Sequence, residues 1–317
     1  MDCQSSNCVS GDAVRDEENQ AAVFDDSAAS APTSLGGLNL IVTYGLLDGN
    51  ETTTSDCIKA YAQSILSSPQ PTFVLLPIGL VPDHVKHFHQ PCAPLIKSLY
   101  GHPLASVSWR VLAEPSLQSP CPRIREFEFE QLPSWFYFPS LRLALSVYLD
   151  DLTLSGPRAN HSKFSDVLRR VVQLEDPAPL SKVLGRGHIK HDGGLALHPA
   201  DFARQCVNLF EDLSGKPVKH ARTPHVDEGS LLATDQADRG QLSNVAAKIV
   251  MKFMWLGRIS TPDLLVAINV CAGHIIRWTV NDDNKRMPRL ACYVAAALDQ
   301  CHIMHIHDKP SDLRLSF

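Results

Sequence analysis

Three aspartates have the residue type and the sequence context for metal-dependent chemistry. Asp150 and Asp151 are adjacent, and Asp56 lies far upstream, where a threonine-rich extended run meets a segment with helical spacing. Adjacent carboxylates raise each other's pKa unless a cation or solvent compensates. Carboxylate oxygens suit Mg²⁺, and two Mg²⁺ ions about 3.5 to 4 Å apart serve phosphoryl and nucleotidyl transfer. Residue types alone leave two interpretations open, a two-metal site and a solvated Asp-Asp turn.

The segment around Asp150 has the clearest secondary-structure pattern in the chain. Large apolar side chains alternate with smaller or polar ones, which is typical of a strand with one buried face. The alternating residues, within 136–155, are Leu141, Leu143, Leu145, Val147 and Leu149. The pattern stops at Asp150 and Asp151 and resumes at Leu152. We therefore expect the two acids at the tip of a β-hairpin, with an amphipathic helix around 164–171 supporting the sheet.

Composition divides the chain into an acidic leader and a globular body. Residues 1–36 are rich in Ser, Ala, Asp and Glu and have few large apolar side chains, so we expect a disordered leader. Residues 1–60 hold ten acids and two bases, net −8, which leaves a net charge of +3 for the rest of the chain. A body that is only weakly basic argues against a module that binds nucleic acid by charge alone.

The expected elements of the body indicate an α+β architecture. A second hairpin is expected at 187–198, where Asp-Gly-Gly supplies residues that tolerate positive φ. Helices are expected near 202–213, 242–257 and 285–300, and a further helix is expected to begin at Thr261-Pro262, with a capping hydroxyl before a first-turn proline. A first half rich in strands and a helical second half are typical of the α+β class.

Cysteines, histidines and hydropathy add expectations about compartment and metals. The nine cysteines are never spaced as C-x-x-C, so we expect reduced thiols and no zinc ribbon. No apolar run reaches about 18 residues and no secretory signal is evident, which predicts no membrane partner and an intracellular location, cytoplasmic or nuclear. Two clusters contain zinc-ligand types without a finger spacing, and we expect their histidines to be solvated. They are His84, His87, His89 and Cys92, and Cys301, His302, His305 and His307.

Several ordered motifs resemble those of copia-type retrotransposon reverse transcriptases. Tyr148-Leu149-Asp150-Asp151, followed by Ser-Gly-Pro, resembles the Y-V-D-D hairpin of that family. Upstream, SDCIKAYAQ is similar to D-V-x-x-A-F-L-N, FVLLPIG to V-x-L-P-x-G, and KSLYGHPLASVSW to K-S-L-Y-G-L-x-Q-x-x-x-x-W. Downstream, KVLGRGHI is similar to the F-L-G primer-grip region, GKPVKHARTP to the K-P-V-x-T-P connection, and MWLGRISTPDL to Y-L-x-x-x-x-R-P-D-I. The likeness extends from about residue 8 to the C-terminus and is that of a truncated Pol polyprotein fragment.

The resemblance implies a right-hand polymerase fold with truncated fingers, an antiparallel-sheet palm and a helical thumb. It places partial fingers and the first part of the palm at 37–135. A palm with the YLDD hairpin and the primer-grip hairpin follows at 136–199, and a helical thumb and connection region at 200–317. The implied activity is RNA-directed DNA polymerisation, with an RNA template, a DNA primer and dNTP as partners and two Mg²⁺ ions as cofactors. The oligomeric state is left open.

The resemblance also implies roles for individual residues. Asp56, Asp150 and Asp151 match the three catalytic, metal-binding aspartates of the family. By that likeness Asp56 and Asp150 would bridge the metals, and Asp151 would have a supporting role. Tyr61 stands where the family places an aromatic side chain against the sugar of the incoming nucleotide, where it would exclude a 2′-hydroxyl. By residue type alone, Tyr61 is an ordinary half-buried helix tyrosine.

Two departures from the family pattern favour a second hypothesis. Leu104 replaces the glutamine that follows L-Y-G-L-x in the family, and leucine cannot hydrogen-bond to template or nucleotide. No Lys or Arg precedes Arg15, where the basic finger residues that grip the triphosphate would lie. The alternative is an inactive remnant that keeps the fold and at most weak nucleic-acid binding. A third class, an aspartyl-phosphate hydrolase, is disfavoured because it requires a D-x-D-x-T spacing and the chain has Asp150-Asp151-Leu152-Thr153.

Overall fold

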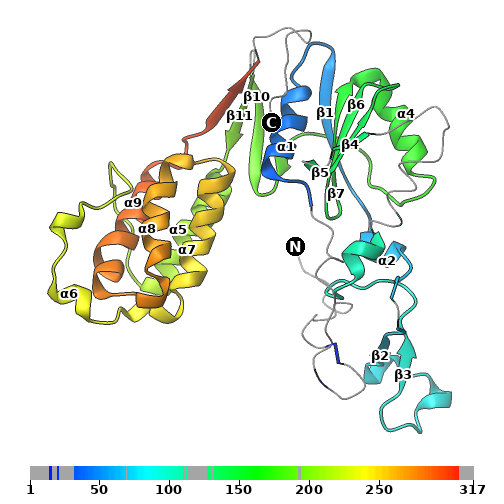
Figure 1. Ribbon diagram of the computed structural model, residues 1–317, viewed down its shortest axis with the longest axis horizontal. Coiled ribbons are helices and arrows are strands. Elements are labelled where there is room, and N and C mark those ends of the chain that lie inside the picture. Colours follow the sequence, from blue (N-terminus) through cyan, green and yellow to red (C-terminus); the bar gives the residue numbers. More distant parts are fainter. Residues whose placement is uncertain are drawn as a thin grey trace. The chain divides into compact units, whose positions relative to one another are not determined.

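The computed structural model describes residues 14–15, 20, 32–68, 70–109, 112, 127–129, 132–191 and 194–306. Within them the fold is α+β with antiparallel sheets, as predicted (Figure 1). The chain divides into two compact units, residues 1–179 and 180–317. The boundary inferred from the sequence at 199/200 lies inside the second unit, so the hairpin at 187–198 groups with the helices that follow it. Most of the expected leader lies outside the described residues.

A six-stranded antiparallel sheet forms the centre of the first unit. Its strand order is β4-β5-β6-β7-β1-β8, so that β1, which is remote in sequence, lies between β7 and β8. The threonine-rich composition of β1 suits a strand because β-branched side chains pack well on a pleated surface. The strands are β1 (Asn50–Asp56), β4 (Phe127–Phe129), β5 (Leu132–Phe138), β6 (Leu143–Tyr148), β7 (Asp151–Pro157) and β8 (Ala178–Pro179).

Two helices cover opposite faces of this sheet (Figure 1). They are α1 (Leu35–Tyr44) and α4 (Arg158–Leu168). In β6, Leu143 packs in one cluster with Phe164 of α4, whereas Ala144 packs with Ile41 of α1. The prediction of a strand with one buried face was therefore wrong, because α1 covers the second face. The predicted strand is also divided, since β5 ends at Phe138 and the chain turns before β6.

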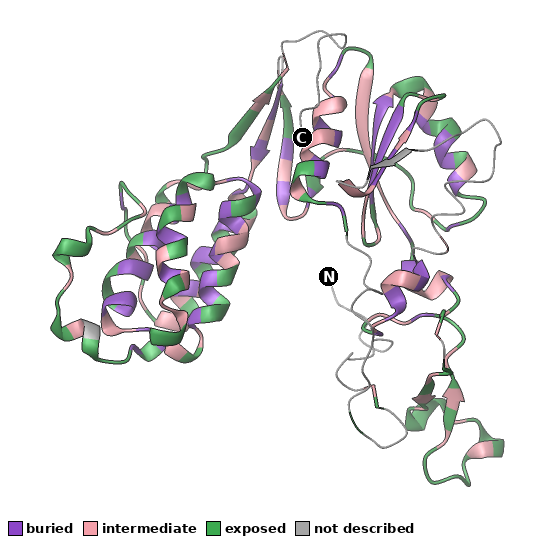
Figure 2. Cartoon of the chain, in the orientation of Figure 1, coloured by how far each residue is buried: buried purple, intermediate pink, exposed green. Residues whose placement is uncertain are grey.

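The described residues between β1 and β4 include several short elements. Among them are α2 (Ala60–Gln63), β2 (Phe73–Leu75), β3 (Cys92–Pro94) and 3₁₀ turns at Ile78–Leu80 and Asp83–Val85. The strand expected around FVLLPIG is present only as the three residues of β2, paired with β3. Much of the region around β2 and β3 is exposed (Figure 2). Its exposed side chains include large apolar ones, namely Phe73, Leu75, Ile78, Leu80, Phe88 and Ile96.

A four-stranded antiparallel sheet begins the second unit, in the order β12-β11-β10-β9. Its strands are β9 (Lys182–Val183), β10 (Arg186–His191), β11 (Gly194–His198) and β12 (His302–His305). The expected second hairpin is confirmed as β10 and β11, and its turn residues 192–193 lie outside the described residues. Strand β12 was not predicted, because four residues near the chain end give no recognisable alternation.

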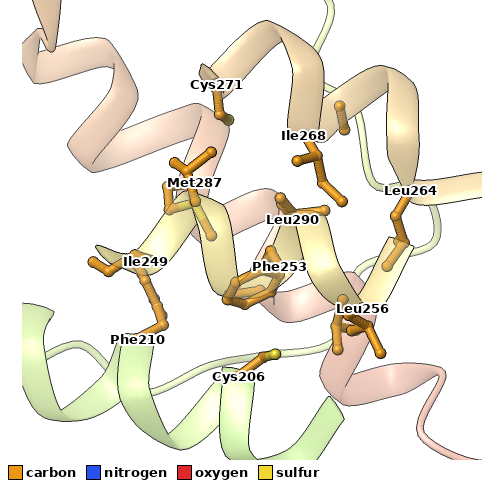
Figure 3. Packing of buried hydrophobic residues seen from close by; sticks show 14 of the residues in the cluster. Cys206, Phe210, Ile249, Phe253, Leu256, Leu264, Ile268, Cys271, Met287 and Leu290 are labelled. Carbon is orange, nitrogen blue, oxygen red and sulfur yellow. The ribbon is translucent and has the colours of Figure 1, made fainter. Parts of the chain in front are cut away.

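Among the remaining described residues of the second unit, helices pack around one apolar core. They are α5 (Ala200–Ser214), α6 (Thr234–Ala237), α7 (Ala246–Ile259), α8 (Leu265–Gly273) and α9 (Met287–Ala296), with 3₁₀ turns at Glu228–Ser230, Gln241–Asn244, Pro262–Leu264 and Ile275–Arg277 and a π-helix at Asp282–Arg286. Figure 3 shows Phe210, Ile249, Phe253 and Leu290 meeting in this core, where Phe253 is fully buried. Among the helices of the described ranges, none is long and apolar enough to cross a membrane.

Two predicted helix ends have different outcomes in the structure. Gly215 closes α5 with a φ of 64°, the left-handed conformation that glycine adopts without steric cost, as predicted. Thr261 does not cap the following helical segment. Its hydroxyl instead donates a hydrogen bond of 3.0 Å to the carbonyl of Leu256, so it satisfies the end of α7 rather than the start of the next turn.

Candidate active site

Asp56 and Asp151 are directly paired across neighbouring strands. Asp56 is the last residue of β1 and Asp151 the first residue of β7, and the antiparallel register places them opposite each other. Residues paired in this way have Cα atoms about 4.5 to 5.5 Å apart and side chains on the same face. The amide of Cys57 also donates to the carbonyl of Asp150 at 2.9 Å. Asp56 therefore meets the adjacent Asp150 and Asp151, which are distant from it in sequence, at one end of the sheet.

Asp150 lies in a tight turn whose backbone is strained. Tyr148 pairs with Asp151, so Leu149 and Asp150 are the two turn residues between β6 and β7. Leu149 has a φ of 58°, and a positive φ at the first turn position is the pattern of a type II′ hairpin turn. A leucine there costs roughly 1 to 2 kcal/mol relative to a right-handed conformation. The indole of Trp109 donates to the Leu149 carbonyl at 3.1 Å, which helps to hold this turn.

Burial and neighbouring negative charge together raise the pKa of Asp56. Desolvation, followed by repulsion from Asp150 and from Asp151, raises the pKa of Asp56 from 3.8 to about 6. The pKa of Asp151 is also raised, by desolvation and by Asp150. A cation bound between these carboxylates would relieve the repulsion.

Glu175 is a fourth acid in the site, and sequence reasoning missed it. Its backbone amide donates to the carbonyl of Asp56 at 2.9 Å, beside a bridge between Cys57 and Leu174. Repulsion from the Glu175 carboxylate contributes to the raised pKa of Asp56. The residue lies in the segment after α4, and no local pattern there reveals that this segment returns to the end of β1.

Two tyrosines border the acids. Tyr61 of α2 and Tyr100 have ring centroids 4.7 Å apart. Desolvation, and then Asp150, raises the pKa of Tyr61, and the same two causes contribute to raising the pKa of Tyr100 to about 12. Both phenols are therefore protonated at neutral pH and can donate hydrogen bonds. Tyr100 lies in the KSLYG segment but was not among the predicted site residues.

The carboxylate oxygens at this end of the sheet are of the type that Mg²⁺ prefers, but they do not surround a common metal position. Among the described residues, no group of three or more His, Cys, Asp or Glu side chains is arranged to hold a metal ion. The carboxylates of Asp56, Asp150 and Asp151 are hard oxygen donors whose mutual repulsion a divalent cation would offset. Rotation of their side chains would have to bring the oxygens together around an ion.

The described histidines of the two clusters are exposed, as expected. His84, His87 and His89 are exposed, as are Cys301 and His302, while His307 lies outside the described residues.

No family model, curated protein or solved structure matches the chain.

We expect Asp56→Asn to stabilise the fold at neutral pH. The folded-state pKa of Asp56, about 6, exceeds the ordinary value of 3.8, so the native state binds the proton more tightly than the unfolded state. The free energy of unfolding of the wild type should therefore fall as pH rises from 3.8 to about 6. The variant lacks this carboxyl group, so its stability should not fall for this reason. After allowance for solvent screening, we expect a gain of about 1 kcal/mol at pH 7 and little gain at pH 4.

Thermal unfolding midpoints measured between pH 4 and pH 7 test this expectation. Asp48→Asn is the matched control, because Asp48 is exposed and precedes the opposite end of β1. A stability difference between Asp56→Asn and wild type that does not change with pH would show that folding does not raise the pKa of Asp56.

Proposed function

We propose that this chain is the polymerase core of a copia-type retrotransposon reverse transcriptase. The first-unit sheet would be the palm and the helices of the second unit the thumb of a right-hand fold. The observation that carries the proposal is the strand register, which pairs Asp56 with Asp151 beside the turn that holds Asp150. The motif resemblance predicts that Asp56 lies beside Asp150 and Asp151. The alternative interpretation, a solvated Asp-Asp turn, makes no prediction about the position of Asp56.

The three aspartates would hold two Mg²⁺ ions, with Asp56 and Asp150 as the bridging ligands. When bound, such ions supply a lowered pKa for the primer 3′-hydroxyl and charge neutralisation at the α-phosphate and the leaving pyrophosphate. The chain positions these ligands through the β1–β7 register and the turn held by Trp109. That placement fixes the ligand backbone before substrate arrives, which lowers the cost of organising the site.

Tyr61 and Tyr100 would form the side of the site that faces the sugar of the incoming dNTP. Tyr61 stands four residues beyond Cys57, at the start of α2, and its ring contacts Tyr100. A rigid aromatic pair at this place would leave no room for a 2′-hydroxyl and so would select deoxynucleotides. The partners of the reaction would be an RNA template and a DNA primer, and an intracellular location follows from this assignment.

The second candidate is an inactive remnant that keeps the fold. Leu104 is only 8% exposed and belongs to the local packing, so it presents no polar group to a template or nucleotide. The carboxylates are also not gathered around an ion. On this alternative, the chain would bind an RNA–DNA hybrid weakly and would not extend it.

Primer extension distinguishes the two candidates. We expect the purified chain, supplied with Mg²⁺ and the four dNTPs, to add nucleotides to a labelled DNA primer annealed to an RNA template. Replacing the dNTPs with ribonucleotides should suppress extension if Tyr61 excludes the 2′-hydroxyl. Binding of the hybrid without extension would favour the remnant, and extension that continues in excess chelator would rule out metal-dependent transfer.

A further inference from the structure

The side-chain amide of Gln63 lies between two backbone segments next to the candidate active site. The segment that follows α4 runs antiparallel to the end of β1, with a backbone bridge between Cys57 and Leu174. Ile58 and Gln173 are therefore the next pair, and in a hydrogen-bonded antiparallel pair the two residues exchange both N–H···O bonds. The amide of Ile58 donates to the carbonyl of Gln173 at 3.0 Å. The return path, from the amide of Gln173 to the carbonyl of Ile58, runs through Gln63.

Three hydrogen bonds form this amide bridge. The Gln63 Oε1 atom accepts from the backbone amide of Gln173 at 2.7 Å. The Gln63 Nε2 group donates to the carbonyl of Ile58 at 2.7 Å and to the carbonyl of Gln173 at 3.1 Å. A carboxylate of the same length lacks the two donors, and an ammonium group lacks the acceptor. The amide bridge therefore requires a carboxamide at this position.

The amide bridge anchors the short helix that carries Tyr61. Helix α2 has four residues and follows Lys59, whose φ of 50° is left-handed. In the part of the chain that the structure describes, no side chain caps this start. A helix of one turn is not stable by itself, so its position depends on the contacts at its ends. Gln63 is the last residue of α2, and the next residue, Ser64, donates from its hydroxyl to that of Ser98 at 3.1 Å.

The same pairing includes the backbone of Asp56. The amide of Glu175 donates to the Asp56 carbonyl at 2.9 Å, two residues along from the pair that Gln63 joins. The Tyr61 ring, two residues before Gln63, contacts the ring of Tyr100 at a centroid distance of 4.7 Å. One side chain therefore ties the helix that carries the aromatic pair to the strand end that carries a candidate metal ligand.

We propose that Gln63 is a positioning residue that sets the sugar selectivity of the site. By holding α2 against the end of β1, it keeps the Tyr61 ring at a fixed distance from the carboxylates. Loss of the amide bridge would let the ring move away and make room for a 2′-hydroxyl. This inference rests on the proposed polymerase function, because it concerns the sugar of the incoming nucleotide.

Primer extension by Gln63→Met, with Gln173→Met as the matched control, tests the proposal on the full chain. Methionine has a similar length but forms none of the three hydrogen bonds. Gln173 contributes its backbone amide and carbonyl to the amide bridge, and the residue is exposed. We expect Gln63→Met to lower the ratio of kcat/KM for a dNTP to that for the ribonucleotide at least about 10-fold, mainly through faster use of the ribonucleotide. The control should keep the wild-type ratio.

A second measurement does not depend on activity. In NMR spectra of tyrosine-labelled protein, the Tyr61 ring signal is assigned through Tyr61→Phe. It should shift in Gln63→Met and not in Gln173→Met, because a displaced ring leaves its contact with Tyr100. Gln63→Glu keeps the accepted bond and loses the donated ones, so it should change both readouts in the same direction. Thermal midpoints show which variants are folded, and Gln63→Glu replaces Gln63→Met if the latter unfolds.

The two failures are distinguishable. An unchanged selectivity ratio in a Gln63→Met protein that extends the primer would overturn the inference and leave the proposed function intact, as would an equal change in the control. Absence of extension by wild type would contradict the proposed function itself. The role of Gln63 in holding Tyr61 would then be decided by the ring signal, and identical signals in wild type and Gln63→Met would overturn it.

Discussion

Asp150→Asn is expected to reduce primer extension about 10³-fold, which corresponds to about 4 kcal/mol of transition-state stabilisation. Asparagine is nearly isosteric with aspartate but lacks the charge that would hold a bridging Mg²⁺. Asp150 occupies a turn whose geometry is set by the backbone of Leu149 and by Trp109, so the substitution should leave the fold intact. Steady-state extension rates on one template-primer measure the effect.

The paired variants make this result specific to the site. Asp56→Asn should cause a similar loss, and the double variant should lose little more, because residues that act on the same ions are not additive. Asp166→Asn is the matched control, since Asp166 lies on the exposed side of α4. Equal extension by wild type and Asp150→Asn would remove Asp150 from the chemistry.

Arg286→Met should destabilise the second unit by about 3 to 5 kcal/mol, because it removes the guanidinium that neutralises the buried Asp282 carboxylate. Asp282 is fully buried and Arg286 is 4% exposed, and their side chains are 2.8 Å apart. Burial alone would raise the pKa of Asp282. Hydrogen bonds from His274, Thr279 and Arg286 outweigh that effect and hold the pKa below its ordinary value. The folded state therefore depends on a charged Asp282.

Urea unfolding of wild type and Arg286→Met at several pH values measures this dependence. The depressed pKa means that the stabilisation is present above about pH 4 and is lost as pH falls through the folded-state pKa, so the difference between the proteins should shrink in acid. Arg204→Met on the exposed side of α5 is the control and should change stability by less than about 0.5 kcal/mol. If Arg286→Met lowers the free energy of unfolding no more than the control does, Arg286 is not needed to neutralise the charge of Asp282.

The features predictable from the sequence are those that depend on nearby residues. The alternation around Leu145 and the interruption at Asp150 and Asp151 indicate a hairpin, because the side-chain period of a strand is local. The helix closed by Gly215 is likewise evident from apolar spacing and a terminal glycine. Neighbouring residues also indicate that Asp56 ends an extended run. Its proximity to Asp150 and Asp151, by contrast, was expected only from the motif resemblance.

The remaining features depend on contacts between segments that are distant in sequence. Helix α1 buries the second face of β6, and neither segment indicates this by itself. Strand β12 joins β11 only because the chain end returns to the hairpin. Glu175 reaches Asp56 by a similar return. The positive φ of Leu149 could not be predicted either, since leucine is not a residue that favours that conformation.

Anomalous diffraction from crystals grown with Mn²⁺, a template-primer and a non-hydrolysable dNTP would test the central claim most directly. We expect two peaks about 3.5 to 4 Å apart at the end of β1, both contacted by carboxylate oxygens of Asp56 and Asp150. Absence of bound ions beside these residues, or a separation of more than about 10 Å between Asp56 and the turn at 149–150, would contradict a shared two-metal site.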